Sequence, residues 1–293
     1  MIKIKNLNIS FKDKEVLKGI DLHVPKNSIY GFLGKNGAGK TTTMKTILGF
    51  LTPDDGEVIV NDEVVKFGGE STNKYIGYLP DVPEFYSYMT AREFLAFCAE
   101  LTKINKEEIK PRVDEILKLV GLENEKHKIK GYSRGMKQRL GIAQALLNKP
   151  KLLICDEPTS ALDPVGRKEI LDTLKAVSKE TTVLFSTHIL SDVERVCTDV
   201  AVLDEGVIKV FGNLEEIKSK YVKEEYTLEL ESIKDIELIK KEFDSIKQIN
   251  NKLLLPSSEL FNVLDFISTN KINVIKLEKN EPTLESLFME VVR

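Results

Sequence analysis

Apolar and polar residues alternate near the start of the chain and give way to short apolar runs further along it. The alternation over Ile2–Ile9 predicts a half-buried strand, and the apolar run Ser28–Leu33 predicts a second one. Further strands are expected at Asp21–Val24, Glu57–Val60, Leu152–Cys155, Thr182–Ser186 and Val200–Leu203, and a helix at Thr41–Leu51. Strands that alternate with helices from Lys151 onward are typical of a parallel sheet with crossover helices. The pattern therefore predicts an α/β protein.

The middle of the chain has the period of helices instead. Residues 90–149 are predicted to be helical, and Thr90 and Glu93 have the spacing of a capping box. Gly121 stands where a helix would end, and Pro111 is expected near the start of its helix. We therefore place a helical subdomain at about residues 85–150.

Glycine usage marks a boundary in the last third of the chain. All 17 glycines lie between Gly19 and Gly212, and the segment that follows is mildly acidic. We predict an accessory α+β domain over residues 221–293, after a larger domain over residues 1–220. Its expected elements are a strand at Tyr226–Leu230, a helix at Ile233–Phe243, strands at Ile246–Ile249 and Lys252–Leu255, a helix at Leu260–Ser268, a strand at Asn273–Leu277 and a closing helix from Thr283. This order is typical of a small ferredoxin-like fold.

Composition narrows the class of partner. With 43 basic and 46 acidic side chains the net charge is −3, so no global positive field attracts nucleic acid, and no nucleic-acid partner is expected. Three widely spaced cysteines suggest neither a disulfide framework nor a zinc cluster and favour a reducing cytoplasm. The N-terminus does not have the pattern of a signal peptide, and the apolar runs are too short to span a bilayer. Any action at a membrane is therefore expected to require a partner chain.

Residues 34–41, Gly-Lys-Asn-Gly-Ala-Gly-Lys-Thr, fit a phosphate-binding loop between a strand and a helix. Glycines let successive backbone N–H groups curl around phosphate oxygens, and the helix N-terminus adds its positive dipole end. Lys40 is expected to span the outer phosphates, and the hydroxyl of Thr41 to reach a magnesium ion.

The apolar strand Leu152–Cys155 ends in two acids, Asp156 and Glu157. Parallel sheets present functional groups at the carboxyl ends of their strands. Asp156 suits a magnesium shell, and Glu157 suits a base that polarises an attacking water.

Residues 132–139, Tyr-Ser-Arg-Gly-Met-Lys-Gln-Arg, precede a helical run that ends near Asn148. Ser133 is the expected N-cap of that helix. The small residues and basic neighbours are typical of an anion site, and an ordinary capped surface helix is the alternative.

In order and spacing these segments resemble the nucleotide-binding subunit of an ABC transporter over about residues 1–220. Residues 34–41 resemble its Walker A motif, 133–138 its signature motif, 152–157 its Walker B motif with the catalytic glutamate, 160–163 its D-loop, and His188 its switch histidine. The resemblance implies a P-loop NTPase core with an antiparallel β subdomain and a helical subdomain. It implies catalytic roles for Lys40, Glu157 and His188, and metal contacts for Thr41, Asp156 and Asp81. The implied nucleotide contacts are Phe11 (stacking on adenine), Gly34, Lys35, Asn36, Gly37, Ala38, Gly39, Lys40, Thr41, Thr42, Ser133, Gly135 and Asp163.

The resemblance also implies the cofactors and partners. ATP and Mg²⁺ on one copy would be covered by the Ser133 helix of a second, identical or related copy, in a head-to-tail dimer. The dimer would drive an integral-membrane subunit from the cytoplasmic face of the membrane. Residues 281–288, Glu-Pro-Thr-Leu-Glu-Ser-Leu-Phe, are similar to the C-terminal extension of bacterial exporters of drugs, peptide antibiotics or lipid-linked cargo, whose membrane subunit is a separate chain.

Two motifs depart from the family pattern. Arg134 replaces a glycine of the signature motif, in which Tyr132 and Met136 also differ, and Asp81 stands where a glutamine opens the Q-loop. One alternative is a soluble ATPase of the same family that clamps nucleic acid or ribosomes. Its relatives usually carry two such domains or a long coiled coil, and residues 90–148 are too short for one. Another alternative is a regulatory or immunity subunit that binds ATP without transport.

Overall fold

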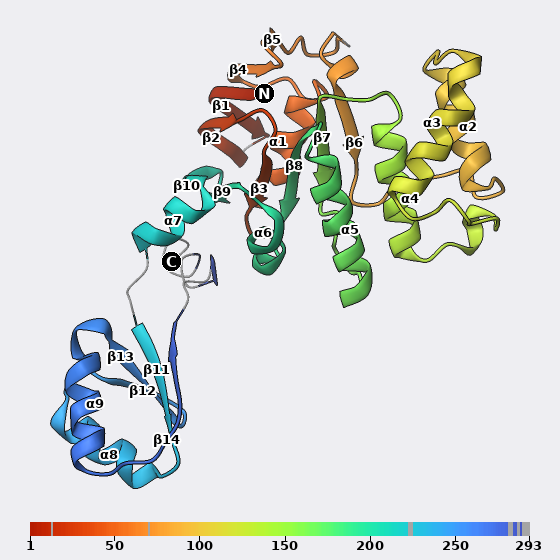
Figure 1. Ribbon diagram of the computed structural model, residues 1–293. Coiled ribbons are helices and arrows are strands. Elements are labelled where there is room, and N and C mark those ends of the chain that lie inside the picture. Colours follow the sequence, from red (N-terminus) through yellow and green to blue (C-terminus); the bar gives the residue numbers. More distant parts are fainter. Residues whose placement is uncertain (13, 70, 222–224, 281–283, 286–287, 289–293) are drawn as a thin grey trace. The chain divides into compact units, whose positions relative to one another are not determined.

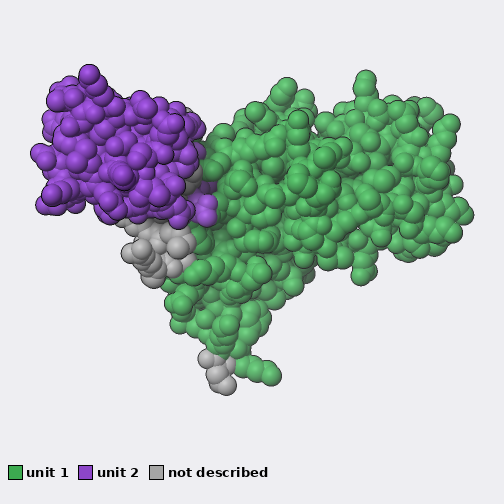
Figure 2. All heavy atoms as spheres, turned by 90° about the horizontal axis from the view of Figure 1, so that it is seen from below, with its two compact units in different colours: residues 1–216, 288–293 green, residues 217–287 purple. Residues whose placement is uncertain are grey.

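The computed structural model describes the chain apart from residues 13, 70, 222–224, 281–283, 286–287 and 289–293. The chain divides into two compact units. The first comprises residues 1–216 and 288–293, and the second comprises residues 217–287 (Figure 2). This boundary lies four residues before the predicted one, which follows residue 220.

An antiparallel sheet opens the first unit. Its strands are β1 (Ile2–Phe11), β2 (Lys14–Val24), β4 (Asp55–Val60) and β5 (Glu63–Val64), in the order β2-β1-β4-β5. Ile2 and Ile4 of β1 lie opposite Val24 and Leu22 of β2, and all four side chains are buried. The predicted alternation is therefore confirmed, because one face of this sheet packs on the core.

A six-stranded sheet forms the centre of the first unit (Figure 1). Its strands are β3 (Ile29–Leu33), β6 (Ile76–Leu79), β7 (Leu152–Asp156), β8 (Thr182–Thr187), β9 (Asp199–Asp204) and β10 (Val207–Asn213), in the order β10-β9-β3-β8-β7-β6. Neighbouring strands are parallel, except that β10 is antiparallel to β9. The predicted α/β class is confirmed, whereas the strands β6 and β10 were not predicted.

Helices cover the parallel sheet. They are α1 (Lys40–Ile47), α5 (Pro164–Val177) and α6 (Leu190–Val196), and α7 (Leu214–Tyr221) follows β10. Tyr30 and Phe32 of β3 belong to the core cluster that also holds Met44 of α1 and the buried residues of the antiparallel sheet. On the opposite face of β3, Gly31 admits α6, because a Cβ there would lie 2.9 Å from Val193. The parallel sheet is thus buried on both faces, as crossover helices require.

Three helices, α2 (Ala91–Leu101), α3 (Lys106–Leu119) and α4 (Arg134–Leu146), form the helical segment that was predicted. Single-turn helices lie before it at Asn73–Tyr75 and within it at Ile129–Gly131. Thr90 and Glu93 form the predicted capping box, and Gly121 follows the end of α3 with φ 66°. The prediction for Pro111 was wrong, since it lies inside α3, five residues after its start. Pro111 is exposed, so water can replace the backbone hydrogen bond that it removes.

The second unit has the predicted ferredoxin-like order. Its elements are β11 (Glu225–Leu230), α8 (Ile233–Glu242), β12 (Lys247–Ile249), β13 (Lys252–Pro256), a single turn at Ser257–Glu259, α9 (Leu260–Thr269) and β14 (Val274–Lys279). The sheet is antiparallel in the order β12-β13-β11-β14. The closing helix predicted from Thr283 begins outside the described residues. Of the described helices, none has both the length and the apolar character that crossing a membrane requires.

Candidate active site

The loop between β3 and α1 has the conformation of a cradle for an anion. Gly39 is the N-cap of α1 with φ 112°, and a Cβ there would lie 2.6 Å from Leu17. A Cβ on Gly34 would lie 2.5 Å from the carbonyl oxygen of Leu203. Both positions therefore require glycine, one for its torsion and both for close packing. The loop consequently turns back on the N-terminus of α1, where free N–H groups attract anions.

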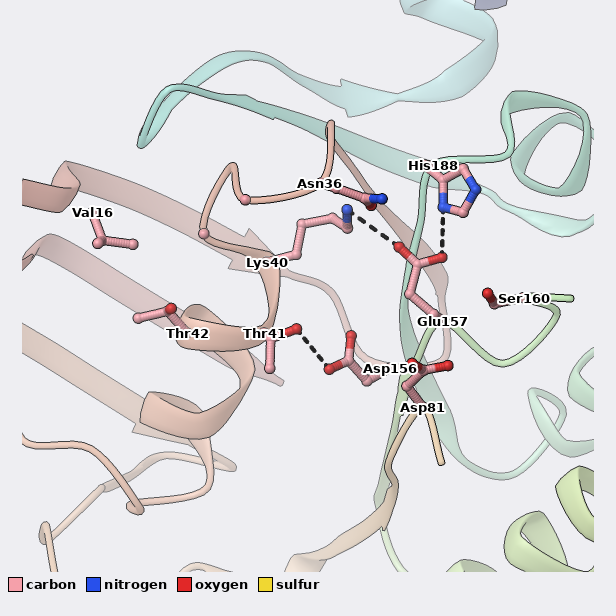
Figure 3. A pocket seen from close by; sticks show the side chains of 12 residues that line it. Val16, Asn36, Lys40, Thr41, Thr42, Asp81, Asp156, Glu157, Ser160 and His188 are labelled. Atoms are coloured by element: carbon pink, nitrogen blue, oxygen red, sulfur yellow. Dashed lines mark hydrogen bonds and ion pairs between the residues drawn. The ribbon is translucent and has the colours of Figure 1, made fainter. Parts of the chain in front are cut away.

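Lys40 is the first residue of α1, and its side chain is only 6% exposed. Its ammonium group donates to the carbonyl oxygen of Gly34 at 2.7 Å and to that of Lys35 at 3.3 Å. It also lies 3.2 Å from Oε1 of Glu157. The sequence thus places one buried cation among oxygen atoms, beside the anion cradle (Figure 3).

Asp156 ends β7 and accepts hydrogen bonds from two hydroxyl groups. Thr41 Oγ1 donates to its Oδ2 at 2.8 Å, and Ser186 Oγ donates to its Oδ1 at 2.5 Å. Asp156 is buried, so these bonds compensate its desolvation. The second bond ties the ends of the neighbouring strands β7 and β8 together.

Glu157 follows Asp156 with φ 48°, a left-handed conformation that is uncommon for a residue with a side chain. Its N–H donates to Ser186 Oγ at 3.0 Å. Its carboxylate is held on both sides, by Lys40 through Oε1 and by Nδ1 of His188 at 2.9 Å through Oε2 (Figure 3). Backbone strain of this kind is found at functional sites, where the surrounding contacts enforce it.

Asp81, in the loop after β6, contributes a third carboxylate. Its backbone oxygen accepts a 2.7 Å hydrogen bond from Gln138 Nε2, and its Oδ1 lies 3.5 Å from Nη2 of Arg134. Burial raises the pKa of Asp81, the Arg134 guanidinium lowers it, and the nearby carboxylates of Asp156 and Glu157 raise it further. On balance the pKa lies above the ordinary aspartate value.

These groups line one cavity of about 410 Å³. The lining residues are Val16, Asn36, Gly37, Gly39, Lys40, Thr41, Thr42, Asp81, Asp156, Glu157, Ser160 and His188. The cavity therefore brings together the phosphate loop, the end of β7, the loop after β6 and the loop after β8. Within it a cation, an anion cradle and three carboxylates face one another, which suits the binding of phosphates together with a metal ion.

Other predicted residues lie beside this cavity or outside its lining. Gly34 and Lys35 contact Lys40 through their carbonyl groups, and Ala38 is buried in the loop. Phe11 is 47% exposed near the end of β1, and Asp163 is the N-cap of α5. Ser133 caps α4 by accepting the N–H of Met136 at 3.2 Å, and Gly135 lies in the first turn of that helix. None of these seven residues lines the cavity of a single chain.

Sequence reasoning missed several residues that shape the site. Ser186 fixes both acids, Gln138 holds the backbone of Asp81, and Val16 and Ser160 line the cavity. The only available signal for Ser160 and Gln138 was their place within matched motifs, and for Ser186 its place at the end of a predicted strand, two residues before His188. Val16 reaches the cavity through the packing of distant strands, and no local pattern indicates that position.

The oxygen-rich part of the cavity fits a magnesium ion that shares its ligands with phosphates. Among the described residues, no group of three or more His, Cys, Asp or Glu side chains is arranged to hold a metal by itself. Magnesium commonly takes only one or two carboxylates from the protein and its other ligands from phosphates and water. The hydroxyl of Thr41 and the carboxylate of Asp156, 2.8 Å apart, are hard oxygen donors of this kind.

Comparison with known proteins agrees with this geometry. A family model described as "ABC transporter" matches residues 17–160, and one described as "ATP-binding protein DrrA1-3-like, C-terminal domain" matches residues 212–292. The ABC transporter ATP-binding protein YxlF of Bacillus subtilis is 40% identical over 100% of this chain and 99% of its own length. The bacitracin transport ATP-binding protein BcrA of Bacillus licheniformis is 36% identical over 100% of this chain and 97% of its own length.

The solved structures that are similar to this chain are also proteins of ABC transporters. The cbiO1 protein of Clostridium perfringens, part of the ABC transporter complex cbiONQ, matches with a TM-score of 0.70 and 31% identity over 75% of this chain and 90% of that one. The dimeric bacterial ABC transporter cassette MJ0796 matches with a TM-score of 0.65 and 27% identity over 73% of this chain and 99% of that one. The cavity, the fold and these likenesses agree, and the chain belongs to the ATP-binding, ATP-hydrolysing proteins of ABC transporters.

Proposed function

We propose that this chain powers export of a drug, a peptide antibiotic or a lipid-like molecule through a separate membrane-spanning subunit, at the cytoplasmic face of the membrane. The names of relatives support the cargo class, because BcrA is a bacitracin transport protein and LnrL of Bacillus subtilis, 29% identical, is a linearmycin resistance protein. The cbiO1 protein is part of a transporter complex, which supports assembly with further subunits. The match of residues 212–292 to a DrrA-like C-terminal domain supports the accessory domain predicted for residues 221–293.

The observation that carries the hydrolytic mechanism is the position of Glu157 between Lys40 and His188. The phosphates of ATP attract the ammonium group of Lys40, which then leaves Oε1 of Glu157 free to accept a proton from the attacking water. His188 keeps the same carboxylate oriented through Oε2 and, as the switch histidine, contacts the γ-phosphate. Glu157 is therefore the water-orienting base in this proposal.

The phosphate loop and the metal supply the electrostatic part of the mechanism. N–H groups of residues 34–41 and the ammonium group of Lys40 hold the phosphates, while Thr41 and Asp156 provide oxygen ligands to Mg²⁺. Mg²⁺ would neutralise charge that develops on the transferred phosphoryl group. Asp81 faces the same side of the cavity and is proposed to contribute to the metal shell through water.

A second copy completes the site in this proposal. Ser133 and Gly135 stand at the N-terminus of α4 but do not line the cavity of their own chain. In a head-to-tail dimer, the α4 N-terminus of one copy would cover the nucleotide of the other, and the dimeric form of MJ0796 supports such an assembly. ATP that binds only the closed dimer would stabilise that state and so do work on the membrane subunit.

The change Glu157→Gln tests the proposed base. Steady-state ATP hydrolysis is expected to fall by about 100-fold or more, because the amide cannot accept the proton. ATP affinity, measured by equilibrium dialysis, is expected to stay within about threefold, since an amide of the same size fills the place. Glu123→Gln, at an exposed position of the helical segment, serves as the control. Undiminished turnover in Glu157→Gln would remove this residue from the mechanism.

The same variant tests the partner. Glu157→Gln held closed with ATP and Mg²⁺ is expected to co-purify from native membranes with a multi-span chain that lacks a phosphate loop of its own. Mass spectrometry identifies that chain. Recovery of ribosomes or nucleic acid instead would favour the soluble clamp. Recovery of a partner that does not stimulate ATP hydrolysis by the unchanged protein would favour a regulatory subunit.

A further inference from the structure

Two of the positions that depart from the family motifs, Asp81 and Arg134, contact each other. Asp81 replaces the Q-loop glutamine and Arg134 replaces a signature glycine, and Nη2 of Arg134 lies 3.5 Å from Oδ1 of Asp81. Asp81 comes from the loop after β6 and Arg134 from the first residue of α4, far apart in the chain. One departure adds an anion to a cavity that already holds two carboxylates, and the other adds the cation that faces it.

A second contact from the same helix holds the same residue. Gln138, one helical turn after Arg134, is 1% exposed and donates through Nε2 to the backbone oxygen of Asp81 at 2.7 Å. Residues four apart lie on one face of a helix, so α4 presents both donors to the loop together. The main chain and the side chain of Asp81 are therefore both held by α4.

The contact with Arg134 orients the carboxylate of Asp81. Oδ1 of Asp81 is buried and accepts no hydrogen bond among the described residues, so the nearby guanidinium of Arg134 is its compensating charge. The side chain as a whole is nevertheless 48% exposed and lines the cavity. Oδ1 is thus turned toward α4, which leaves the other edge of the carboxylate, with Oδ2, for the cavity.

We propose that Arg134 is a positioning residue that turns Asp81 Oδ2 toward the metal ion of the nucleotide bound in the same copy. Gln138 fixes the loop on which Asp81 lies, so the arrangement of α4 is transmitted to the metal shell within one chain. The inference rests on the proposed function in one respect, namely that a metal-nucleotide occupies this cavity. This positioning role differs from a direct contact of Arg134 with the nucleotide of a second copy, because the positioning effect requires Asp81.

Manganese binding measured by electron paramagnetic resonance tests this inference without hydrolysis. Mn²⁺ replaces Mg²⁺ and ADP replaces ATP, at protein concentrations where light scattering shows a single copy, so that only contacts within one chain count. The variants are Arg134→Gln, Arg134→Lys, Asp81→Gln and the double change Asp81→Gln with Arg134→Gln. Arg92→Ala is the matched control, because Arg92 pairs with Asp114 in the helical segment at similar exposure and does not line the cavity. Thermal melting of each variant checks that it folds.

Arg134→Gln is expected to weaken Mn²⁺ binding in the presence of ADP by about tenfold, the lower end of the loss seen when a residue that orients a metal ligand is removed. Arg134→Lys restores the charge and is expected to recover most of this loss. In the Asp81→Gln background the same arginine change is expected to alter Mn²⁺ affinity by less than about twofold, because no carboxylate remains for the arginine to orient. Arg92→Ala is expected to bind as the unchanged protein does.

Three results would overturn the inference. Unchanged Mn²⁺ binding in Arg134→Gln would mean that the arginine does not position Asp81, and tighter binding would mean that it only repels the metal ion. An equal loss in the Asp81→Gln background would mean that Arg134 acts without Asp81. Failure of the unchanged protein to bind Mn²⁺ with ADP would overturn the proposed function and this inference with it, whereas the first two results leave the proposed function intact.

Discussion

The two units of this chain differ in what their interiors contain. Among the described residues, buried polar and charged side chains lie in the first unit, and they include Lys40, Asp156, Gln138 and Ser186 of the site. The second unit packs Leu228, Leu253, Val263 and its other core residues into a purely apolar cluster. Buried polar groups are costly unless each finds a partner, and those of the site are hydrogen-bonded to one another or to the backbone. The first unit therefore combines an apolar core with a polar site, whereas the buried core of the second unit is apolar throughout its described residues.

One helix end in each unit shows how the residue at a left-handed position can vary. After α3 of the first unit, Gly121 takes φ 66°, and Leu122 donates to the carbonyl oxygen of Leu117. After α9 of the second unit, Lys271 takes φ 54°, and Ile272 donates to that of Ile267. These are the same C-terminal motif, made once with the residue that it favours and once without it. Lys103, after α2 of the first unit, makes the same motif with φ 61°, so a lysine at this position is not confined to the second unit.

Removal of the buried cation Lys40 should give the largest effect. It tests whether the polar site of the first unit binds a ligand. Lys40→Ala is expected to weaken ATP binding by about 1,000-fold, roughly 4 kcal/mol, because the ammonium group makes more than one charge-assisted hydrogen bond to the phosphates. Isothermal titration calorimetry measures the affinity. Lys45→Ala, an exposed position on the same helix, should leave it unchanged. Full affinity in Lys40→Ala would remove the phosphate loop from the proposed site.

A cavity in the second core should give the next largest effect and tests whether the two units are stabilised separately. Leu253 is fully buried in the apolar cluster, so Leu253→Ala is expected to destabilise the second unit by about 3 kcal/mol. Hydrogen exchange should rise over β11 and β13 and stay unchanged over β3 and α1. Leu254→Ala, on the same strand but only partly buried, should do less. Equal loss of protection in both units would contradict separate cores.

Exchange of the residues at the two left-handed positions, Gly121 and Lys271, should have the smallest effect on stability. Lys271→Gly is expected to stabilise the second unit by about 0.5–1 kcal/mol, because glycine adopts the left-handed torsion without strain. Gly121→Lys is expected to destabilise the first unit by a similar amount. Denaturant unfolding followed by hydrogen exchange measures both changes. The same sign of effect in the two variants would show that packing, not the torsion, decides these positions.

Motif order and local pattern predicted most of the architecture. The fold class, the helical segment and the ferredoxin-like order are confirmed, because each rests on periodicity or on glycines with a local role. The strand β6 was missed because it is short and contains Gly77, a residue that disfavours strands. The glycine is required by tertiary packing, because a Cβ on Gly77 would lie 2.1 Å from the carbonyl oxygen of Ala145 in α4.

The site could be predicted as a set of residues but not as a set of contacts. Lys40, Thr41, Asp156, Glu157 and His188 were named from motifs, and the structure gathers them in one cavity. Their partners were invisible, because the hydroxyl of Ser186 and the amide of Gln138 reach the site only after distant segments fold together. The contact between Asp81 and Arg134 is of the same kind, since a single sequence presents two separate departures and does not show that they meet.

The left-handed torsion at Glu157 means that the order of the two acids cannot be exchanged. In an extended strand, neighbouring side chains point to opposite faces, whereas this one torsion lets both reach into a single cavity in different directions. Asp156 meets the hydroxyl of Thr41 with a one-methylene reach, and Glu157 spans to Lys40 and His188 with two. The two acids therefore reach partners at different distances from the main chain. The shorter side chain belongs to Asp156, which is still part of β7.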